Sequence, residues 1–121
     1  MPDDDIDRDE LTEIVLVFSP VDMGLGKAAG QAFQAALRAH FWSHALDGLY
    51  DYLSDGTRTI VKRAQSESIF QRIIEEVPGY VMVDEGFTEF GGKRTATLFV
   101  SHPFKHRDRP KVLDHKRVKM L

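Results

Sequence analysis

The fold is decided by residues 12–40, which begin with an apolar stretch and end with an alanine-rich one. Thr12–Phe18 reads TEIVLVF, Ser19–Gly26 reads SPVDMGLG, and Lys27–His40 reads KAAGQAFQAALRAH. A short, β-rich and almost continuously apolar run predicts a buried central strand. The proline and glycines that follow predict a loop, and the alanines predict a helix. A strand, a loop and a helix in this order indicate an α/β protein.

The predicted helix has an apolar pair at helical spacing. Phe33 and Leu37 are four residues apart and share a face, with Ala29, Ala32 and Ala36 nearby. We expect these small side chains to let the helix lie close to a sheet.

Further elements follow from the same kind of pattern. A capping box of Ser68 and Gln71 predicts a helix start, and the helix has an apolar stripe made of Ile69, Phe70, Ile73, Ile74 and Val77. The expected elements are a helix over 43–53, a strand over Arg58–Arg63, a helix from Ser68 to about Val77, and strands over Tyr80–Val83 and Thr95–Val100. The order β-α-α-β-α-β-β predicts an α/β fold with a mixed sheet, because the last connection is too short for a helical crossover. Those last two strands are either antiparallel partners or separated neighbours.

Length and composition exclude several classes of protein. The chain has 121 residues and no cysteine, which suits one domain and excludes a thiolate nucleophile or a disulfide framework. No apolar run is long enough for a membrane span, and the acidic start MPDDDIDRDE does not resemble a signal peptide. A cytoplasmic location is the simplest expectation. His40 and His44 have a metal-compatible spacing, but no third ligand is evident, so we predict no metal.

The net charge of −3 conceals an acidic head and a basic tail. Residues 3–10 carry a net charge of −5, whereas residues from Lys105 onward carry +5. We therefore divide the chain into a disordered acidic leader (1–11), a domain (12–103) and a basic extension (104–121). The tail, together with Lys62, Arg63, Lys93 and Arg94, is expected to form a positive face for RNA.

The glycine loop before the first helix admits more than one interpretation. A phosphate-binding loop needs a hydroxyl residue after Gly26-Lys27, and Ala28 stands there instead. A dinucleotide fingerprint is formally present at Gly24, Gly26 and Ala29, but the second strand lacks the expected acid at its end. A glycine loop that closes onto a helix start without any ligand is the simplest alternative.

A wider comparison of motifs suggests a family. The string Gly26–Ala35 resembles the G-K-x-A-A-Q-x-x-H-A helix start of type 2 peptidyl-tRNA hydrolases, the archaeal and eukaryotic class. Asp84–Thr88 resembles the D-x-G-x-T motif of that family, and Gly91 to Thr97 resembles its G-T-x-T motif. The resemblance covers about residues 12–103, and both blocks occur in the right order on the expected elements.

This resemblance implies a fold and an activity. It implies a three-layer α/β/α sandwich with a four-stranded mixed sheet, a homodimer, and hydrolysis of the ester that joins a peptide to tRNA. It implies neither a metal nor an organic cofactor. The substrate and partner would be peptidyl-tRNA, and no membrane is involved.

The resemblance also assigns roles to particular residues. It implies catalytic roles for Lys27, Asp84, Thr88 and Thr95, with Thr97 as a rival to Thr95 because of a one-residue offset. Ester hydrolysis needs an activated water and a donor for the oxyanion, which Asp84 and Lys27 can supply. The residues expected to contact the substrate are Gly26, Gln31, Gln34, Lys93 and Arg94.

Several positions depart from the family pattern. The family histidine on the helix is replaced by Gln34, which forms hydrogen bonds but carries no proton. Glu85 adds a negative charge beside the expected site, and Phe87 replaces a polar or basic residue. A non-catalytic RNA-binding homologue that has kept the fold is therefore the alternative function. A nucleotide-binding protein that uses the glycine loop is a third possibility.

Overall fold

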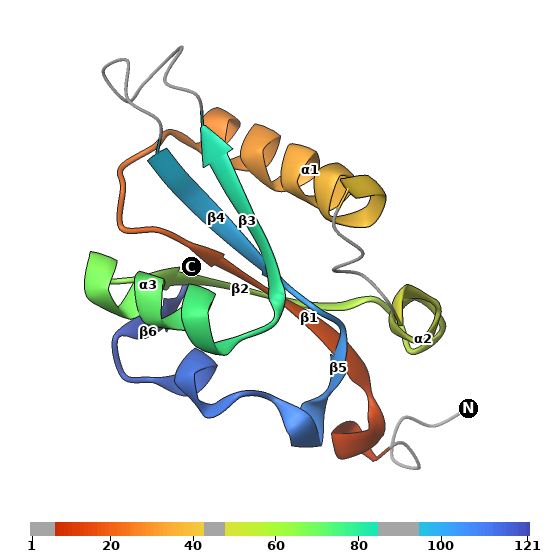
Figure 1. The fold of residues 1–121 in the computed structure, drawn as a ribbon. Helices are drawn as coiled ribbons and strands as arrows, with labels where there is room; N and C mark the ends of the chain where they lie inside the picture. Colours follow the sequence, from red (N-terminus) through yellow and green to blue (C-terminus); the bar gives the residue numbers. More distant parts are fainter. Residues whose placement is uncertain (1–6, 43–47, 85–94) are drawn as a thin grey trace.

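The computed structural model describes residues 7–42, 48–84 and 95–121. Within these residues the chain is an α/β protein with an open, six-stranded mixed sheet and three α-helices (Figure 1). The α-helices are α1 (Leu25–Trp42), α2 (Leu49–Ser54) and α3 (Glu67–Glu76). The strands are β1 (Thr12–Phe18), β2 (Arg58–Ala64), β3 (Gly79–Asp84), β4 (Thr95–Ser101), β5 (Phe104–Lys105) and β6 (Val118–Met120). Short 3-10 turns are η2 (Arg8–Glu10), η3 (His106–Asp108) and η4 (Lys111–Asp114).

The strand order places β1 at the centre of the sheet, as its apolar sequence predicts. The order is β3-β4-β1-β2-β6, with β5 paired to the start of β1. β1 and β2 are parallel, whereas β4 is antiparallel to both β1 and β3. The prediction of a mixed sheet is confirmed, and the last two predicted strands are antiparallel partners. The predicted count of four strands is wrong, because residues after 103 add β5 and β6.

The two faces of the sheet have separate apolar cores. Side chains of β1 alternate, so that Val15 and Val17 contact one cluster while Ile14 and Phe18 contact the other. α3 packs on the first face, together with Val112 and Leu113 of η4. α1 packs on the second face through Ala28 and Ala35. Helical layers therefore cover both faces (Figure 1).

The buried face of α1 differs from the predicted one. Phe33 and Leu37 are 68% and 45% exposed, whereas Ala28, Ala35 and Ala39 are buried. Small side chains do allow the helix to approach the sheet, but they lie on the opposite stripe from the large apolar pair. Periodicity fixed the angular spacing of residues without deciding which stripe faces the sheet.

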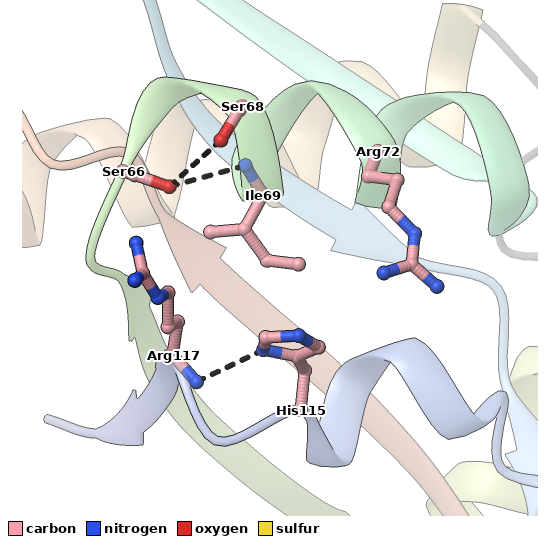
Figure 2. A pocket seen from close by; sticks show the side chains of 6 residues that line it. All are labelled: Ser66, Ser68, Ile69, Arg72, His115 and Arg117. Carbon is pink, nitrogen blue, oxygen red and sulfur yellow. Dashed lines mark hydrogen bonds between the residues drawn. The ribbon is translucent and has the colours of Figure 1, made fainter.

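The N-cap of α3 lies two residues before the predicted one. Ser66, not Ser68, is the N-cap, and its Oγ accepts a hydrogen bond from the amide of Ile69 at 3.3 Å (Figure 2). The predicted capping box is therefore wrong. The apolar stripe of this helix is confirmed, since Ile69, Phe70 and Ile73 are buried.

The C-terminal residues are integrated into the packing of the domain. Val112, Leu113 and Val118 belong to the core cluster under α3, so residue 103 does not mark a break in packing. Residues 8–10, within the expected leader, form η2. There Glu10 makes an ion pair with Arg107. The acidic head and the basic tail thus meet on the same molecule.

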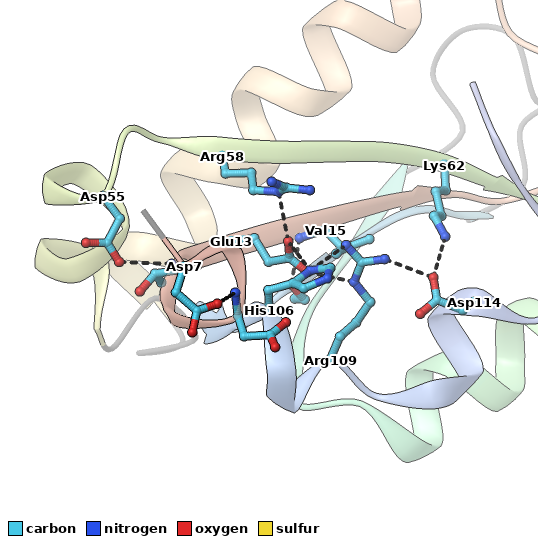
Figure 3. A network of polar contacts seen from close by, with 12 residues as sticks. Asp7, Glu13, Val15, Asp55, Arg58, Lys62, His106, Arg109 and Asp114 are labelled. Carbon is cyan, nitrogen blue, oxygen red and sulfur yellow. Dashed lines mark hydrogen bonds and ion pairs between the residues drawn. The ribbon is translucent and has the colours of Figure 1, made fainter. Parts of the chain in front are cut away.

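A buried carboxylate joins the start of β1 to this C-terminal segment. The side chain of Glu13 has no solvent exposure, and Figure 3 shows it surrounded by Arg58, His106 and Arg109. The ion-pair distances are 3.1 Å to Arg58 Nε, 3.2 Å to His106 Nδ1 and 2.6 Å to Arg109 Nε. The two arginines beside this buried carboxylate compensate for its lost hydration.

Asp114 extends this network to β2. Its Oδ1 accepts from Lys62 Nζ at 3.1 Å and from Arg109 Nη1 at 2.9 Å. Burial acts to raise the pKa of Asp114, but the hydrogen bonds from Lys62 and Arg109 outweigh it, so this pKa is lowered. Hydrogen bonds from Thr12, followed by the charge of Lys105, likewise lower the pKa of Asp55. Both carboxylates are therefore held in the charged form.

Candidate functional site

Lys27, Gln31 and Asp84 meet at the carboxyl end of β3, beneath the first turns of α1. Lys27 Nζ lies 2.7 Å from Asp84 Oδ2, and Gln31 Nε2 donates to the same oxygen at 3.3 Å. Lys27 and Gln31 are one helical turn apart, so both side chains reach the same place. The sequence placed these three residues in one site, and the structure brings them together.

Strand direction explains why distant residues converge here. β1 and β3 run parallel because each is antiparallel to β4. The carboxyl end of β1 leads into α1, and the carboxyl end of β3 carries Asp84, so both lie at one edge of the sheet. Open α/β sheets place ligands at this edge.

Thr97 extends the polar cluster into the sheet. Its Oγ1 donates to Gln31 Oε1 at 2.6 Å, and the residue has no exposed surface. Because the amide oxygen of Gln31 accepts from Thr97, its Nε2 is turned towards Asp84. The buried threonine therefore fixes the orientation of the glutamine.

A register shift between β3 and β4 aims Thr97 at this site. Met82 pairs with Leu98 and Val83 pairs with Ala96, which leaves Thr97 as an extra residue on β4. Such bulges redirect side chains and are frequent next to active sites. Thr95 lies directly opposite Asp84 in the register. Thr97 makes the hydrogen bond to Gln31, while Thr95 is the direct neighbour of Asp84, so both predicted threonines lie at the site.

The remaining predicted residues are distributed as follows. Gly26 lies exposed in the first turn of α1, and Gln34 is exposed two turns further along. Lys27, Gln31, Gln34 and Arg38 follow the spacing i, i+4, i+7 and i+11, which keeps them on one side of the helix. Arg38 was not predicted, although this spacing was available to find it. Thr88, Lys93 and Arg94 lie outside the described residues, as do Glu85, Phe87 and His44.

Fewer basic side chains are available to RNA on the predicted positive face than expected, because several of them form ion pairs within the protein. Lys62 is buried and donates to Leu113 O at 2.7 Å and to Asp114, so it is not available to RNA. In the tail, Lys105 pairs with Asp55, and Arg109 pairs with Glu13 and Asp114. The exposed bases of the described tail that remain are Lys111, Lys116, Arg117 and Lys119.

Comparisons with known proteins add no assignment. No protein-family model and no curated protein matches the chain. Within residues 7–42, 48–84 and 95–121, no helix has the length and apolar character that a membrane crossing requires. The described residues also contain no cluster of three or more histidine or carboxylate side chains suited to a metal ion.

Proposed function

We propose that this protein hydrolyses the ester bond of peptidyl-tRNA, with Asp84 and Lys27 at the reacting centre. The single observation that carries the proposal is the cluster of Lys27, Gln31 and Asp84 around one carboxylate oxygen. A lysine, an amide and a carboxylate at the carboxyl edge of an α/β sheet suit an acyl-transfer reaction to water. The motif resemblance described above names the same residues.

Asp84 is the group that orients the attacking water and accepts its proton. A carboxylate offers about four lone-pair positions, so Asp84 can accept from Lys27, Gln31 and a water molecule together. The water adds to the ester carbonyl carbon, the bond to the ribose oxygen breaks, and the proton passes to that oxygen. Proton transfer by a positioned side chain contributes roughly 10²–10⁴-fold to such reactions.

Lys27 stabilises the negative charge that develops on the carbonyl oxygen. Its side chain is 18% exposed, beside an Asp84 side chain that is 9% exposed, so the ion pair is partly shielded from water. An ammonium has three donors and can bind Asp84 and an oxyanion at once. Thr97 supports this arrangement through Gln31, and Gln34 and Arg38 extend a polar track along α1 for the substrate.

The replacement of the family histidine by Gln34 is compatible with this mechanism. Gln34 is exposed on α1, and the proton transfer assigned to Asp84 does not require an ionisable group at that position. If the histidine contacts substrate in the family, a glutamine amide preserves hydrogen bonding there. The same proposal includes the three-layer α/β/α architecture of the family. It also includes a cytoplasmic location for the protein.

The proposal includes a homodimer formed through the outer stripe of α1. Phe33, Leu37 and Phe41, at successive i, i+4 positions, are 68%, 45% and 71% exposed. Neighbouring large apolar side chains on one helix face are typical of interaction sites. Light scattering of the wild type should give a dimer mass, and Phe33→Ser/Phe41→Ser should give a monomer mass. A wild-type monomer at all accessible concentrations contradicts this part of the proposal.

The decisive experiment is cleavage of N-acetylaminoacyl-tRNA by the pure protein. We expect release of the blocked amino acid by the wild type, and a loss of about 10³-fold in Asp84→Asn. Asp51→Asn, at an exposed position on α2, serves as the matched control and should retain full activity. Equal activity of Asp84→Asn and the wild type, or no cleavage by folded wild-type protein, contradicts the proposal. In the latter case, retained tRNA binding would identify the RNA-binding alternative.

A further inference from the structure

A second candidate site, lined by basic side chains, lies on the face of the sheet that α3 covers, opposite the face that α1 covers. A cavity of about 270 Å³ is lined by Ser66, Ser68, Ile69, Arg72, His115 and Arg117. Figure 2 shows the cavity between α3 and the chain segment that leads into β6, with basic side chains contributed from both sides. Arg72 comes from α3, whereas His115 and Arg117 come from the C-terminal segment. Residues from two distant parts of the chain therefore build this site.

We propose that this cavity binds the sugar-phosphate backbone of RNA. The inference rests on the proposed function, because the RNA is the tRNA body of the same substrate. Guanidinium groups bind phosphate through paired hydrogen bonds, and serine hydroxyls add neutral donors. Apart from the amide of Ile69, which donates to Ser66 Oγ, the first amides of α3 have no partners within the helix and favour an anion near them. The main evidence for this proposal is the position of Arg72, His115 and Arg117 around the cavity, and the start of α3 is supporting evidence.

The hydrogen bonds within the site favour donation towards a ligand. His115 Nδ1 accepts from the backbone amide of Arg117 at 3.0 Å, so the other ring nitrogen carries the hydrogen and is a donor. Ser66 Oγ lies 3.1 Å from Ser68 Oγ at the start of α3. Gln65 N donates to Arg117 O at 2.9 Å, which ties the two sides of the cavity together.

Nearby carboxylates weaken the affinity of the site for any single phosphate. Arg72 Nε lies 2.5 Å from Glu76 Oε2, and Glu67 is exposed in the first turn of α3. The Arg72 and Glu76 side chains are 52% and 47% exposed, so their pairing contributes little and can be exchanged for a phosphate contact. A polynucleotide held at several points compensates for the weak affinity of each one.

The position of the cavity matches a ligand that also reaches Asp84. α3 follows the carboxyl end of β2, which is parallel to β1 and β3, so the cavity lies at the same edge of the sheet as Asp84. β2 and β3 are separated by three strand spacings, which amount to about 14 Å. RNA that crosses this edge can place its ester at Asp84 and its backbone at Arg72 and Arg117.

The test compares two double variants that each remove two positive charges. Arg72→Gln/Arg117→Gln alters the cavity, and Lys111→Gln/Lys119→Gln removes exposed charges that do not line it. Binding of deacylated tRNA is measured across a salt series. We expect the cavity variant to bind about 10-fold more weakly, with a salt slope reduced by about two. The lysine control should bind within twofold of the wild type.

A lysine replacement separates charge from geometry. Arg72→Lys/Arg117→Lys should retain the salt slope but lose part of the affinity, because lysine cannot form the paired hydrogen bonds. Equal weakening in the cavity variant and the lysine control overturns the inference, as does unchanged binding in both. Displacement of tRNA by inorganic phosphate at matched ionic strength also overturns it, because the site then takes single phosphates.

The result is independent of whether the protein cleaves the ester. Deacylated tRNA contains no ester, so its binding does not require hydrolysis. Arginine-dependent binding without cleavage of N-acetylaminoacyl-tRNA contradicts only the proposed function. Cleavage combined with arginine-independent binding contradicts only the second site.

Discussion

Asp84 and Glu13 are both carboxylates in the sheet, but their surroundings differ. Glu13 lies at the start of β1, has no exposed side-chain surface, and is enclosed by Arg58, His106 and Arg109. Asp84 lies at the end of β3, retains 9% side-chain exposure, and is contacted by the flexible Lys27 and by Gln31. Glu13 has the setting of a structural ion pair, whereas Asp84 has the partly exposed setting that the proposed hydrolysis needs.

Accessibility is the property that separates the two clusters. The C-terminal segment covers Glu13 and supplies two of its partners from η3 and the residue that follows it. Asp84 lies at the edge where parallel strands end, and its partners come from the start of a helix. A carboxylate must admit water to act on an ester, and only the second location permits this.

Glu13→Gln should cause the largest change and should affect stability. Loss of the carboxylate charge removes a buried ion-pair partner from both Arg58 and Arg109, although Arg109 keeps its pair with Asp114. Breaking a buried pair in this way costs about 3–5 kcal/mol. Urea unfolding measures the difference, with Glu10→Gln as a control whose exposed pair with Arg107 contributes under about 1 kcal/mol. Equal stability of the two variants would contradict the structural role.

Lys27→Met should affect activity and leave the fold intact. Removal of one donor to a developing oxyanion costs about 100-fold in rate, which corresponds to about 2.7 kcal/mol. The side chain is partly exposed at the sheet edge, so we expect a melting temperature close to that of the wild type. Steady-state cleavage of N-acetylaminoacyl-tRNA tests this, with Lys111→Met as the control. If Lys27→Met lowers the melting temperature but cleaves at the wild-type rate at low temperature, Lys27 has a structural role and not the proposed catalytic one.

Thr97→Val tests the hydrogen bond that supports Gln31 in the proposed active site. The shape of the side chain is retained, while Gln31 Oε1 loses the donor that fixes the amide. We expect a loss of about 1 kcal/mol of stability for the unmade hydrogen bond and a comparable loss in the transition state, about fivefold in kcat. Thr59→Val is the matched control: it removes an exposed hydroxyl on β2 that hydrogen-bonds to Tyr52 and Thr57, and it should leave kcat unchanged. Unchanged kcat in Thr97→Val would show that Gln31 does not need this contact.

Acid should weaken the structural region by a smaller amount. Asp114 and Asp55 have lowered pKa values in the folded protein, so their stabilisation is complete above the ordinary value of about 3.9. It is lost as the pH falls through the lowered folded values. Because Asp114 is half exposed, its share is under about 1 kcal/mol. Melting curves at pH 7, 5 and 3 should show Asp114→Asn approaching the wild type at low pH. A difference in melting temperature between the two proteins that stays the same from pH 7 to pH 3 would contradict this link between the charge of Asp114 and stability.

Part of the candidate site could be predicted because it depends on local spacing. Lys27 and Gln31 are one turn apart on a helix that its alanine-rich sequence predicts, and Asp84 directly follows a strand that the apolar residues 80–83 predict. The choice between Thr95 and Thr97 could not be made from sequence, because a bulge in β4 changes which residues face α1. A one-residue shift reverses the direction of side chains along a strand.

The cavity at Arg72 and Arg117 also could not be predicted from the sequence, because the residues that line it are far apart in the chain. Neither residue belongs to a motif, and they are brought together because β6 pairs with β2. The charge of the C-terminal residues predicted a basic extension over 104–121, yet Leu113 within it is fully buried. Such a short segment becomes ordered only where the rest of the domain offers it a surface to cover.

The sequence by itself determined the four main strands, the apolar stripe of α3, and the spacing of Lys27 and Gln31. These features follow from side-chain periodicity and backbone preferences, which act over a few residues. The tertiary structure alone decided which stripe of α1 is buried, how Thr97 reaches Gln31, and where the acidic head and basic tail meet. Each of these depends on packing between segments far apart in the chain, because burial and pairing are settled only when every neighbouring surface is present.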